Sequence, residues 1–438
     1  MKIKEINIVN FKGFQNETIR FNGNPTVVIG NNTAGKTTLL KALQVGLGAY
    51  LQSLSHLPGG NQYRRNFSTL DRFKAFDSKL RDYIPNKEKP RITIDAEFPS
   101  NISGNGFVPI HWYREFSGTY TTHTKACAGE LIDAVRVMEH LRNEEHQANV
   151  YPIVLSFGAK RTSDAQVRTN VKTKERASRI EKAYKFALHD KVDFEGAMEW
   201  LKRYDKNVKD KKEFEGTREA FFEALQIALP ALSDIDYDNG EIEAVVSVSG
   251  HEPSRHHFSY MSDGLQSMIN IVSEIAHRCI ELNGCLGAEA IKRTPGVVMI
   301  DEVDMYLHPH WQKHVLRDLV KAFPLVQFIV TTHSPFIVQS LKEGQLISFD
   351  KGVLTSGEPF REGLEDITSQ RMGLKQDIRS ARFNKMVDLA TRLFSAVDQG
   401  KPDEELKTQL DQIEAEYSDD PAYLASVRIE YKARQKKQ

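Results

Sequence analysis

The run that could most clearly do chemistry extends from Gly30 to Thr37 and reads GNNTAGKT. It fits the pattern GxxxxGK[ST], follows the apolar run PTVVI and precedes the helical stretch TTLLKALQVGLG. In such a loop, backbone N–H groups wrap a phosphate chain at the positive end of the helix. Lys36 would reach the β- and γ-phosphates, and the Thr37 hydroxyl would bind Mg²⁺. The predicted ligands are ATP and Mg²⁺, and the predicted binding residues are Gly30, Asn31, Asn32, Thr33, Ala34, Gly35, Lys36, Thr37 and Thr38.

A second candidate is the apolar run GVVMI, which ends in the carboxylates of Asp301 and Glu302. Such a run is typical of a buried parallel strand. Asp301 would hold Mg²⁺ through water, and Glu302 would polarise the attacking water as general base. Acidic residues commonly end strands, so this prediction depends on the pairing with the P-loop.

Two further elements complete the set. Ser262, Gly264 and Gln266 open the helical stretch MINIVSEIAHR, where a hydroxyl and free N–H groups could face an anion. His333 follows the apolar run FIVTT and could donate to a γ-phosphate. Each alone would be read as an ordinary helix cap or a structural histidine. Their order along the chain favours the nucleotide roles.

The elements that must position these residues follow from hydrophobic patterning. Strands are predicted at 2–8, 91–98, 107–116, 152–157 and 242–249, and a helix near 130–143. No heptad repeat persists in the charged, helical stretch 163–230, which indicates a compact insert and not a coiled-coil arm. The predicted domains are an ATPase lobe with the P-loop (1–162), a helical insert (163–230), a second ATPase lobe (231–360) and a C-terminal helical region (361–438).

The order of these four motifs resembles that of the ABC, SMC and RecF class of AAA-type ATPases. The segments NFKGF, PIVLSFGAKR, AMEWLKRYD, IDEVDMYLHPHWQ and QFIVTTHSPFIV are similar to the bacterial family of predicted ATP-binding proteins involved in virulence. That family includes the ATPase subunit of Septu anti-phage systems and ATPases encoded beside some retrons. The resemblance covers roughly residues 1–50 and 150–350. It implies an α/β fold: an ABC-type head with a helical insert and a C-terminal helical region.

The resemblance also implies roles for the residues. Lys36, Glu302 and His333 would be catalytic, and Thr37 and Asp301 would hold the metal. Ser262 and Gly264 would be the signature that a second molecule supplies, so ATP would lie at the interface of a head-to-tail homodimer that closes on binding. Residues 307–309 match the D-loop region, and the Q-loop is not identified, Gln147 being a candidate.

Thr33 departs from the family pattern, which usually has glycine there. A β-branched residue disfavours positive φ, so an altered loop and slow turnover are expected.

For function, the resemblance implies an ATP-gated regulatory subunit of an anti-phage complex. An HNH nuclease encoded separately would be its partner, and a retron reverse transcriptase with its DNA–RNA product is a further candidate component. DNA would be contacted directly or through a partner. Two alternatives stay open: a RecF/SMC-like DNA repair ATPase without a nuclease partner, and a scaffold that holds ATP with little turnover.

Composition limits these alternatives only loosely. Lys plus Arg and Asp plus Glu number 59 each, so any DNA contact needs a local basic patch. The insert offers one, which could equally be a solvated helix face: Lys172, Lys174, Arg176, Arg179, Lys182 and Lys185. A signal peptide and an apolar run of roughly 20 residues are absent from the sequence, so a cytoplasmic location without membrane contact is expected.

Other patterns favour ordinary structure. The acidic stretch 361–366 lacks the preceding strand of a Toprim nuclease. The histidines at 251, 256, 257 and 277 are better explained by a loop and a helix face than by a metal site. The three cysteines form no CxxC pair. Near the C-terminus, apolar side chains at helical spacing favour either a helix docked on its own core or a surface for a partner: Phe383, Met386, Leu389, Leu393 and Val397.

Overall fold

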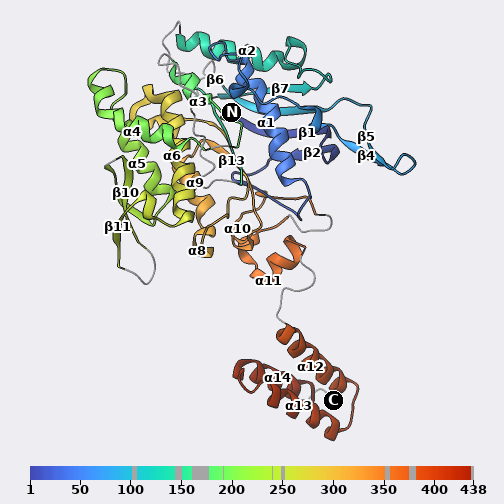
Figure 1. Cartoon of the computed structure of the whole chain (residues 1–438). Coiled ribbons are helices and arrows are strands. Elements are labelled where there is room, and N and C mark those ends of the chain that lie inside the picture. Colours follow the sequence, from blue (N-terminus) through green and yellow to red (C-terminus); the bar gives the residue numbers. More distant parts are fainter. Residues whose placement is uncertain are drawn as a thin grey trace. The chain divides into compact units, whose positions relative to one another are not determined.

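The computed structural model describes residues 1–100, 106–143, 150–159, 177–190, 192–238, 240–247, 252–350, 356–373 and 381–435. The chain divides into two compact units, Met1–Ile367 and Thr368–Gln438 (Figure 1). Among the described residues, no helix combines the length and the apolar character that a membrane span requires.

A five-stranded parallel sheet lies at the centre of the first unit, in the order β14-β3-β13-β12-β8. Its strands are β3 (Thr26–Ile29), β8 (Ile153–Phe157), β12 (Gly296–Ile300), β13 (Val326–Thr331) and β14 (Leu346–Ser348). Every residue of β3, β8, β12 and β13 is buried, as expected for a parallel sheet covered on both faces. Because the strands are parallel, the loops that follow them meet at one edge.

A second sheet is antiparallel and has the order β2-β1-β6-β7. It is formed by β1 (Lys2–Phe11), β2 (Phe14–Arg20), β6 (Arg91–Ser100) and β7 (Gly106–Glu115), which confirms three of the predicted strands and adds β2. Helix α1 (Lys36–Ser53) packs closely on it: a Cβ at Gly46 would lie 2.3 Å from Ile94 Cδ1. The Trp112 indole donates to the Gly46 carbonyl at 2.9 Å. The helix expected near 130–143 is α2 (Lys125–Asn143).

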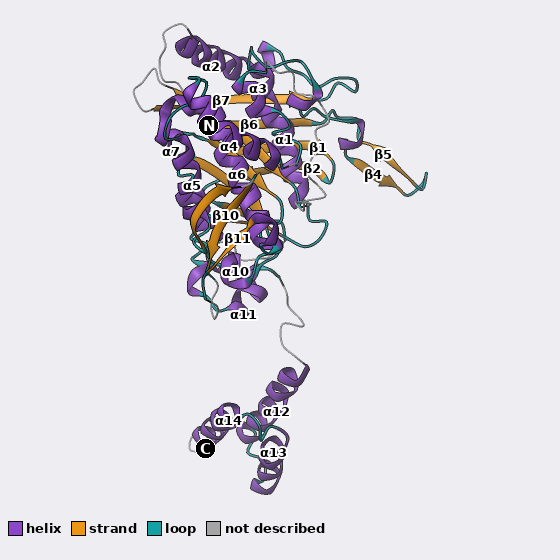
Figure 2. Ribbon diagram, turned by 60° about the vertical axis from the view of Figure 1, so that its left-hand side comes forward, coloured by secondary structure: helices purple, strands orange, loops and turns teal. Residues whose placement is uncertain are grey.

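A small hairpin of β4 (Lys74–Asp77) and β5 (Asp82–Pro85) projects from the region of β1 and β2, and Figures 1 and 2 agree on this. The sequence patterns did not predict this hairpin, because neither of its faces is buried and its residues do not alternate between apolar and polar. Within the part of the chain that the structure describes, its two strands pair with each other and with no other strand.

A helical part lies beside the parallel sheet. Helix α6 (Asp263–Asn283) contacts α3 (Arg179–Tyr184), α4 (Phe194–Lys209) and α5 (Thr217–Ala228). The helical character predicted for 163–230 is thus observed from 179 onward, and residues 160–176 lie outside the described part. A three-stranded sheet of β9 (Leu232–Asp238), β10 (Glu241–Val246) and β11 (Ser254–His257) adjoins these helices. The remaining helices of this unit are α7 (Ala290–Arg293), α8 (Pro309–Gln312), α9 (Val315–Ala322), α10 (Pro335–Gln339) and α11 (Leu364–Asp366).

The second unit consists of α12 (Ala381–Asp398), α13 (Asp403–Glu416) and α14 (Pro421–Gln435). Met386, Leu393 and Val397 of α12 are buried in a shared apolar core with Leu406 and Ile413 of α13. The interpretation of α12 as a helix docked on its own core is therefore confirmed for these three residues. The Phe383 side chain lies outside the described residues.

Candidate nucleotide-binding site

The loop between β3 and α1 has the tight, unusual backbone that the GxxxxGK[ST] pattern predicts. Gly30 and Gly35 take φ values of 154° and 109°, and a Cβ at Gly35 would come within 2.7 Å of the Phe14 ring. Thr33 also takes a positive φ, 74°, so the left-handed turn is kept at the position where a β-branched residue is strained. Asn31, Asn32, Thr33 and Thr37 are exposed, Lys36 is buried, and Gly30, Ala34, Gly35 and Thr38 are half-buried.

Lys36 lies at the centre of this loop. Its Nζ donates to the carbonyl oxygens of Gly30 at 2.6 Å and Asn31 at 3.1 Å. Burial lowers the pKa of Lys36, while the nearby carboxylates of Asp350, Asp301 and Glu302 act in the opposite direction. The ammonium is therefore positioned by backbone acceptors of its own loop, within the field of three carboxylates.

Hydrogen bonds join the P-loop to the end of β12. The Thr37 hydroxyl donates to Asp301 Oδ2 at 2.9 Å, and the Thr331 hydroxyl donates to Asp301 Oδ1 at 2.6 Å. The backbone N–H of Glu302 donates to Thr331 Oγ1 at 2.8 Å. A hydroxyl and a carboxylate side by side are the oxygen ligands that suit Mg²⁺, which usually takes one or two protein groups together with phosphate oxygens and water. The donor set thus fits the expected metal.

His333 follows β13 and is exposed, whereas its neighbours Thr332 and Ser334 are buried and tied down. The Thr332 hydroxyl donates to Asp304 Oδ1 at 2.6 Å. The Ser334 hydroxyl donates to Gln312 Oε1 at 2.6 Å, and Ser334 caps α10. The backbone at His333 is therefore fixed on both sides while its ring faces outward.

The predicted signature opens α6. Ser262 is the N-cap residue, yet its side chain makes no capping hydrogen bond and is exposed. Gly264 is packed so tightly on the loop after β12 that a Cβ would lie 2.4 Å from the Tyr306 carbonyl oxygen. Gln266 Nε2 donates to the Met261 carbonyl at 2.8 Å. In the described part of the chain, no hydrogen bond joins Ser262, Gly264 or Gln266 to the P-loop of the same molecule.

Asp350, which the sequence analysis did not identify, also belongs to this site. It follows β14, and its Oδ1 accepts from both the backbone N–H and the side-chain Nδ2 of Asn31, each at 3.1 Å. The signal was present in the run LISFD, a short apolar strand ending in an acid like the one before Asp301. Gln147 and His251 lie outside the described residues.

A second missed cluster surrounds Asp190. Lys41 and Gln44 of α1 and Ser156 of β8 all contact its carboxylate, with the Ser156 hydroxyl donating at 2.6 Å. Burial lowers the pKa of Lys41. The cluster ties the P-loop helix to the segment that leads into the helical part. Sequence could not have revealed it because Asp190 lies in a loop without any motif.

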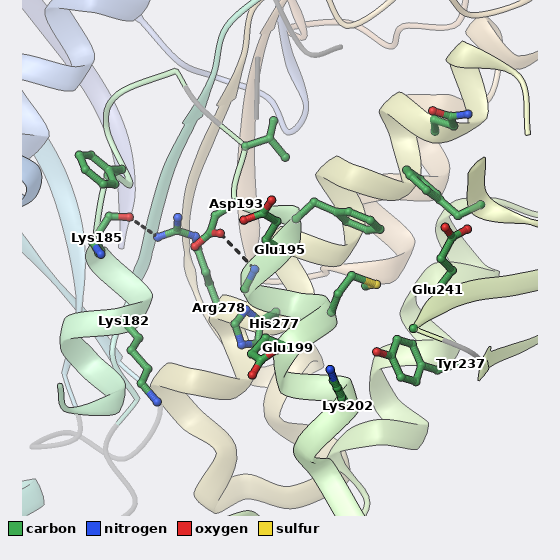
Figure 3. A pocket seen from close by; sticks show the side chains of 18 of the residues that line it. Lys182, Lys185, Asp193, Glu195, Glu199, Lys202, Tyr237, Glu241, His277 and Arg278 are labelled. Carbon is green, nitrogen blue, oxygen red and sulfur yellow. Dashed lines mark hydrogen bonds between the residues drawn. The ribbon is translucent and has the colours of Figure 1, made fainter. Parts of the chain in front are cut away.

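A pocket of about 880 Å³ is lined by residues of α3, α4, α6, β9 and β10 (Figure 3). Its lining includes Ser259 and Gln266 and mixes cations with carboxylates: Lys182, Lys185, Lys202, Glu195, Glu199 and Glu241. Arg179 pairs with Glu213 at 2.9 Å. The described half of the basic run predicted on the insert is therefore partly neutralised, and Lys172, Lys174 and Arg176 lie outside the described residues.

The described residues hold no group of three or more His, Cys, Asp or Glu side chains that could bind a metal ion by themselves. His256, His257, His277 and Cys279 are thus not part of such a cluster. This finding does not bear on Mg²⁺, which needs phosphate oxygens as well as protein ligands.

A parallel sheet whose carboxyl edge presents a P-loop, an Asp–Glu pair and a histidine, together with an antiparallel sheet and a helical part, defines a P-loop ATPase with an ABC-type head. The chain belongs to the AAA domain family, whose family model matches residues 5–233, more than half of the sequence. Residues 173–339 match a family described as "AAA domain, putative AbiEii toxin, Type IV TA system".

Similar proteins agree with the resemblance seen in the sequence. The chain is 24% identical over 417 residues to the retron Ec83 probable ATPase of Escherichia coli, covering 81% of this chain and 74% of that protein. It is 22% identical to the retron Vc95 probable ATPase of Vibrio cholerae serotype O1 biovar El Tor, covering 79% and 73%. The Septu protein PtuA of Bacillus thuringiensis is 33% identical over 110 residues, 24% of this chain and 26% of that protein.

Among solved structures, the chain is similar to an SMC head bound to the C-winged helix domain of ScpA. The TM-score is 0.46 and the identity 17%, covering 80% of this chain and 94% of that one. For the SMC head domain from Thermotoga maritima the TM-score is 0.42 and the identity 15%, covering 82% and 98%.

Proposed function

We propose that the chain is the ATP-gated regulatory subunit of an anti-phage defence complex, acting as a head-to-tail homodimer with ATP at the interface. The observation that carries the composite site is at Ser262, whose exposed hydroxyl neither caps its own helix nor bonds to its own P-loop. A hydroxyl and helix N-terminus placed in this way can receive an anion from another molecule.

The chemistry assigned to each group follows its position. The P-loop N–H groups and Lys36 would hold the β- and γ-phosphates, and Thr37 and Asp301 would hold Mg²⁺, which would neutralise charge at the phosphates. Glu302 takes a proton from the attacking water. His333, on its fixed backbone, donates to the γ-phosphate, and Ser262 with Gly264 of the second molecule closes the other side. Loss of the γ-phosphate removes the contacts made across the interface, and the dimer opens.

The defence role is supported by the relatives, two of which are named as retron ATPases and one as a Septu protein. The partner in this proposal is an HNH nuclease encoded separately, as the family resemblance of the sequence implies. A retron reverse transcriptase with its DNA–RNA product is a further component of the proposed complex, DNA is met directly or through these partners, and the complex works in the cytoplasm.

The composite site is tested by mixing two inactive variants, Lys36→Ala and Ser262→Arg. If each site draws on two molecules, neither variant alone has an intact site, but a mixed dimer contains one. Co-expressed variants should then recover up to about a quarter of wild-type ATP hydrolysis, the share expected from random pairing in a two-fold dimer. Absence of recovery in purified mixed dimers would show that the site does not depend on a second molecule.

A scaffold that holds ATP with little turnover is the second candidate, and the strained Thr33 favours it. Replacing Glu302 with Gln separates the two functions. The switch predicts that hydrolysis falls by about 10²-fold or more and that ATP locks the dimer, whereas a scaffold would show unchanged phosphate release. A DNA repair role without nuclease would instead be indicated if the purified native complex contained DNA but no nuclease subunit.

A further inference from the structure

The hairpin β4–β5 is built in an unusual way for a protein surface. Both strands are exposed on both faces, apart from the half-buried Asp77. Phe76 is 58% exposed, Tyr83 62% and Leu80 69%. A two-stranded hairpin without a core behind it is marginally stable. Its large exposed apolar side chains therefore contribute little to folding, and binding to another molecule would explain their presence.

The base of the hairpin is anchored to the body of the first unit, while its tip extends away (Figures 1 and 2). The Phe73 N–H donates to the Asn10 carbonyl at 2.9 Å, and the Asn86 amide donates to Asn10 Oδ1 at 2.7 Å. The Arg72 guanidinium donates to the Asn86 carbonyl at 2.9 Å. The hairpin therefore presents its tip on a fixed stem.

The two aromatic rings share one face of this ribbon. Phe76 and Tyr83 are directly paired across the strands, and their ring centroids lie 5.3 Å apart in an edge-to-face arrangement. Lys74, two residues before Phe76, lies on the same face because side chains alternate along a strand. One face of the hairpin thus combines two exposed rings with a cation.

The charge of the segment is basic in a chain that is neutral overall. Residues 72–91 contain seven Lys and Arg but three Asp and Glu. At the tip, Lys79 and Arg81 are exposed and form no ion pair among the described residues. The nearby carboxylate of Asp77 is hydrogen-bonded within the turn: its Oδ1 accepts from the backbone N–H groups of Lys79 and Leu80 at 2.8 and 3.1 Å. The tip cations are therefore available to phosphates.

We propose that the β4–β5 hairpin binds a single-stranded nucleic acid, with bases stacking on Phe76 and Tyr83 and phosphates contacting Lys74, Lys79 and Arg81. Exposed rings interleaved with cations favour unpaired bases, since every base offers a π-face only when it is free of a duplex. A protein partner would use the apolar tip residue Leu80 as well, and this difference separates the two cases.

Binding is measured by fluorescence anisotropy with labelled 20-nucleotide oligothymidine and oligouridine, and with a duplex of the same length, using the full-length chain. Phe76→Ala combined with Tyr83→Ala should weaken binding of the single strands by about tenfold or more, the loss expected for one or two stacked bases. Lys79→Gln combined with Arg81→Gln should reduce the slope of log affinity against log salt by about 1.4, or ~0.7 per phosphate contact. Phe76→Trp supplies a direct readout, because stacking of a base quenches indole emission.

Controls are available in the same chain. Lys206→Gln with Lys209→Gln removes two exposed cations from α4 and should leave oligonucleotide affinity unchanged. Leu80→Ala removes exposed apolar surface without a ring and should also have little effect. Because none of these side chains is part of a core, thermal stability and ATP hydrolysis should remain those of the wild type. Equal affinity of the wild type and the double aromatic variant for the single strands, or a loss of affinity on Leu80→Ala as large as that of the double aromatic variant, would overturn the proposal.

Discussion

Thr37 and Asp301 are 264 residues apart in the sequence, and a 2.9 Å hydrogen bond joins the Thr37 hydroxyl to Asp301 Oδ2. The other carboxylate oxygen of Asp301 accepts from Thr331. These two bonds hold the carboxylate against the first turn of the P-loop helix. The two groups that would bind Mg²⁺ are therefore already adjacent, which lowers the ordering cost of metal binding.

Removing either group should uncouple nucleotide binding from Mg²⁺. Thr37→Ala and Asp301→Asn should each weaken ATP binding by about tenfold or more in the presence of Mg²⁺, because an oxygen ligand or its charge is lost. Titration calorimetry in EDTA supplies the matched control, where the variants and the wild type should bind ATP alike. An equal loss with and without the metal would assign these residues to the fold and not to Mg²⁺.

The site is only partly predictable from sequence, and the reason differs from residue to residue. The P-loop and Asp301 were predictable because apolar strands precede them and the parallel sheet brings strand ends to one edge. The contact of Asp350 with Asn31 depends on the position of β14 beside β3, which no local pattern encodes. The β4–β5 hairpin was not predicted because neither of its faces is buried. Its sequence therefore lacks the alternation of apolar and polar residues that indicates a strand.

Asp350 should oppose nucleotide binding. Its carboxylate occupies the Asn31 N–H, one of the backbone donors that a phosphate would use, and adds negative charge beside the loop. Asp350→Asn keeps an acceptor oxygen but removes the charge, so ATP affinity should rise by about fivefold, equivalent to roughly 1 kcal/mol of relieved repulsion. The pKa of Lys36 should fall further, since Asp350 is one of the carboxylates that raise it.

Asp350→Ala distinguishes the effect of charge from that of the tether. Both variants should bind ATP more tightly if repulsion dominates, and binding is measured with a fluorescent ATP analogue in competition with ATP. Weaker binding by both would mean that Asp350 is needed to shape the P-loop.

Thr33 should limit the site through backbone strain. A side chain at φ 74° costs about 1–2 kcal/mol, which glycine would avoid, although glycine loses more conformational freedom on folding, which costs about 0.5–1 kcal/mol. Thr33→Gly should therefore change thermal stability little and raise the steady-state rate of ATP hydrolysis several-fold, as a less strained loop fits the phosphates better. Thr33→Val keeps the branched side chain without the hydroxyl and should behave as the wild type. If valine alone changed the rate, the hydroxyl and not the strain would be responsible.

Any larger residue at Gly264 should disturb the packing of α6 on the loop after β12. A Cβ there would lie 2.4 Å from the Tyr306 carbonyl oxygen, and the contacting atom belongs to backbone that cannot rotate away. Gly264→Ala should lower the free energy of unfolding by about 1–3 kcal/mol and displace the start of α6 from the loop after β12. ATP hydrolysis should be lost, whereas ATP binding to the P-loop should remain within about twofold of the wild type, since within the described residues Gly264 makes no hydrogen bond to that loop. Gly129→Ala is the control: no atom lies within 4 Å of its added Cβ, so this helical substitution should raise stability by about 0.5–1 kcal/mol and leave hydrolysis unchanged. Equal effects of the two alanines on hydrolysis would show that the packing of Gly264 on Tyr306 has no part in the reaction.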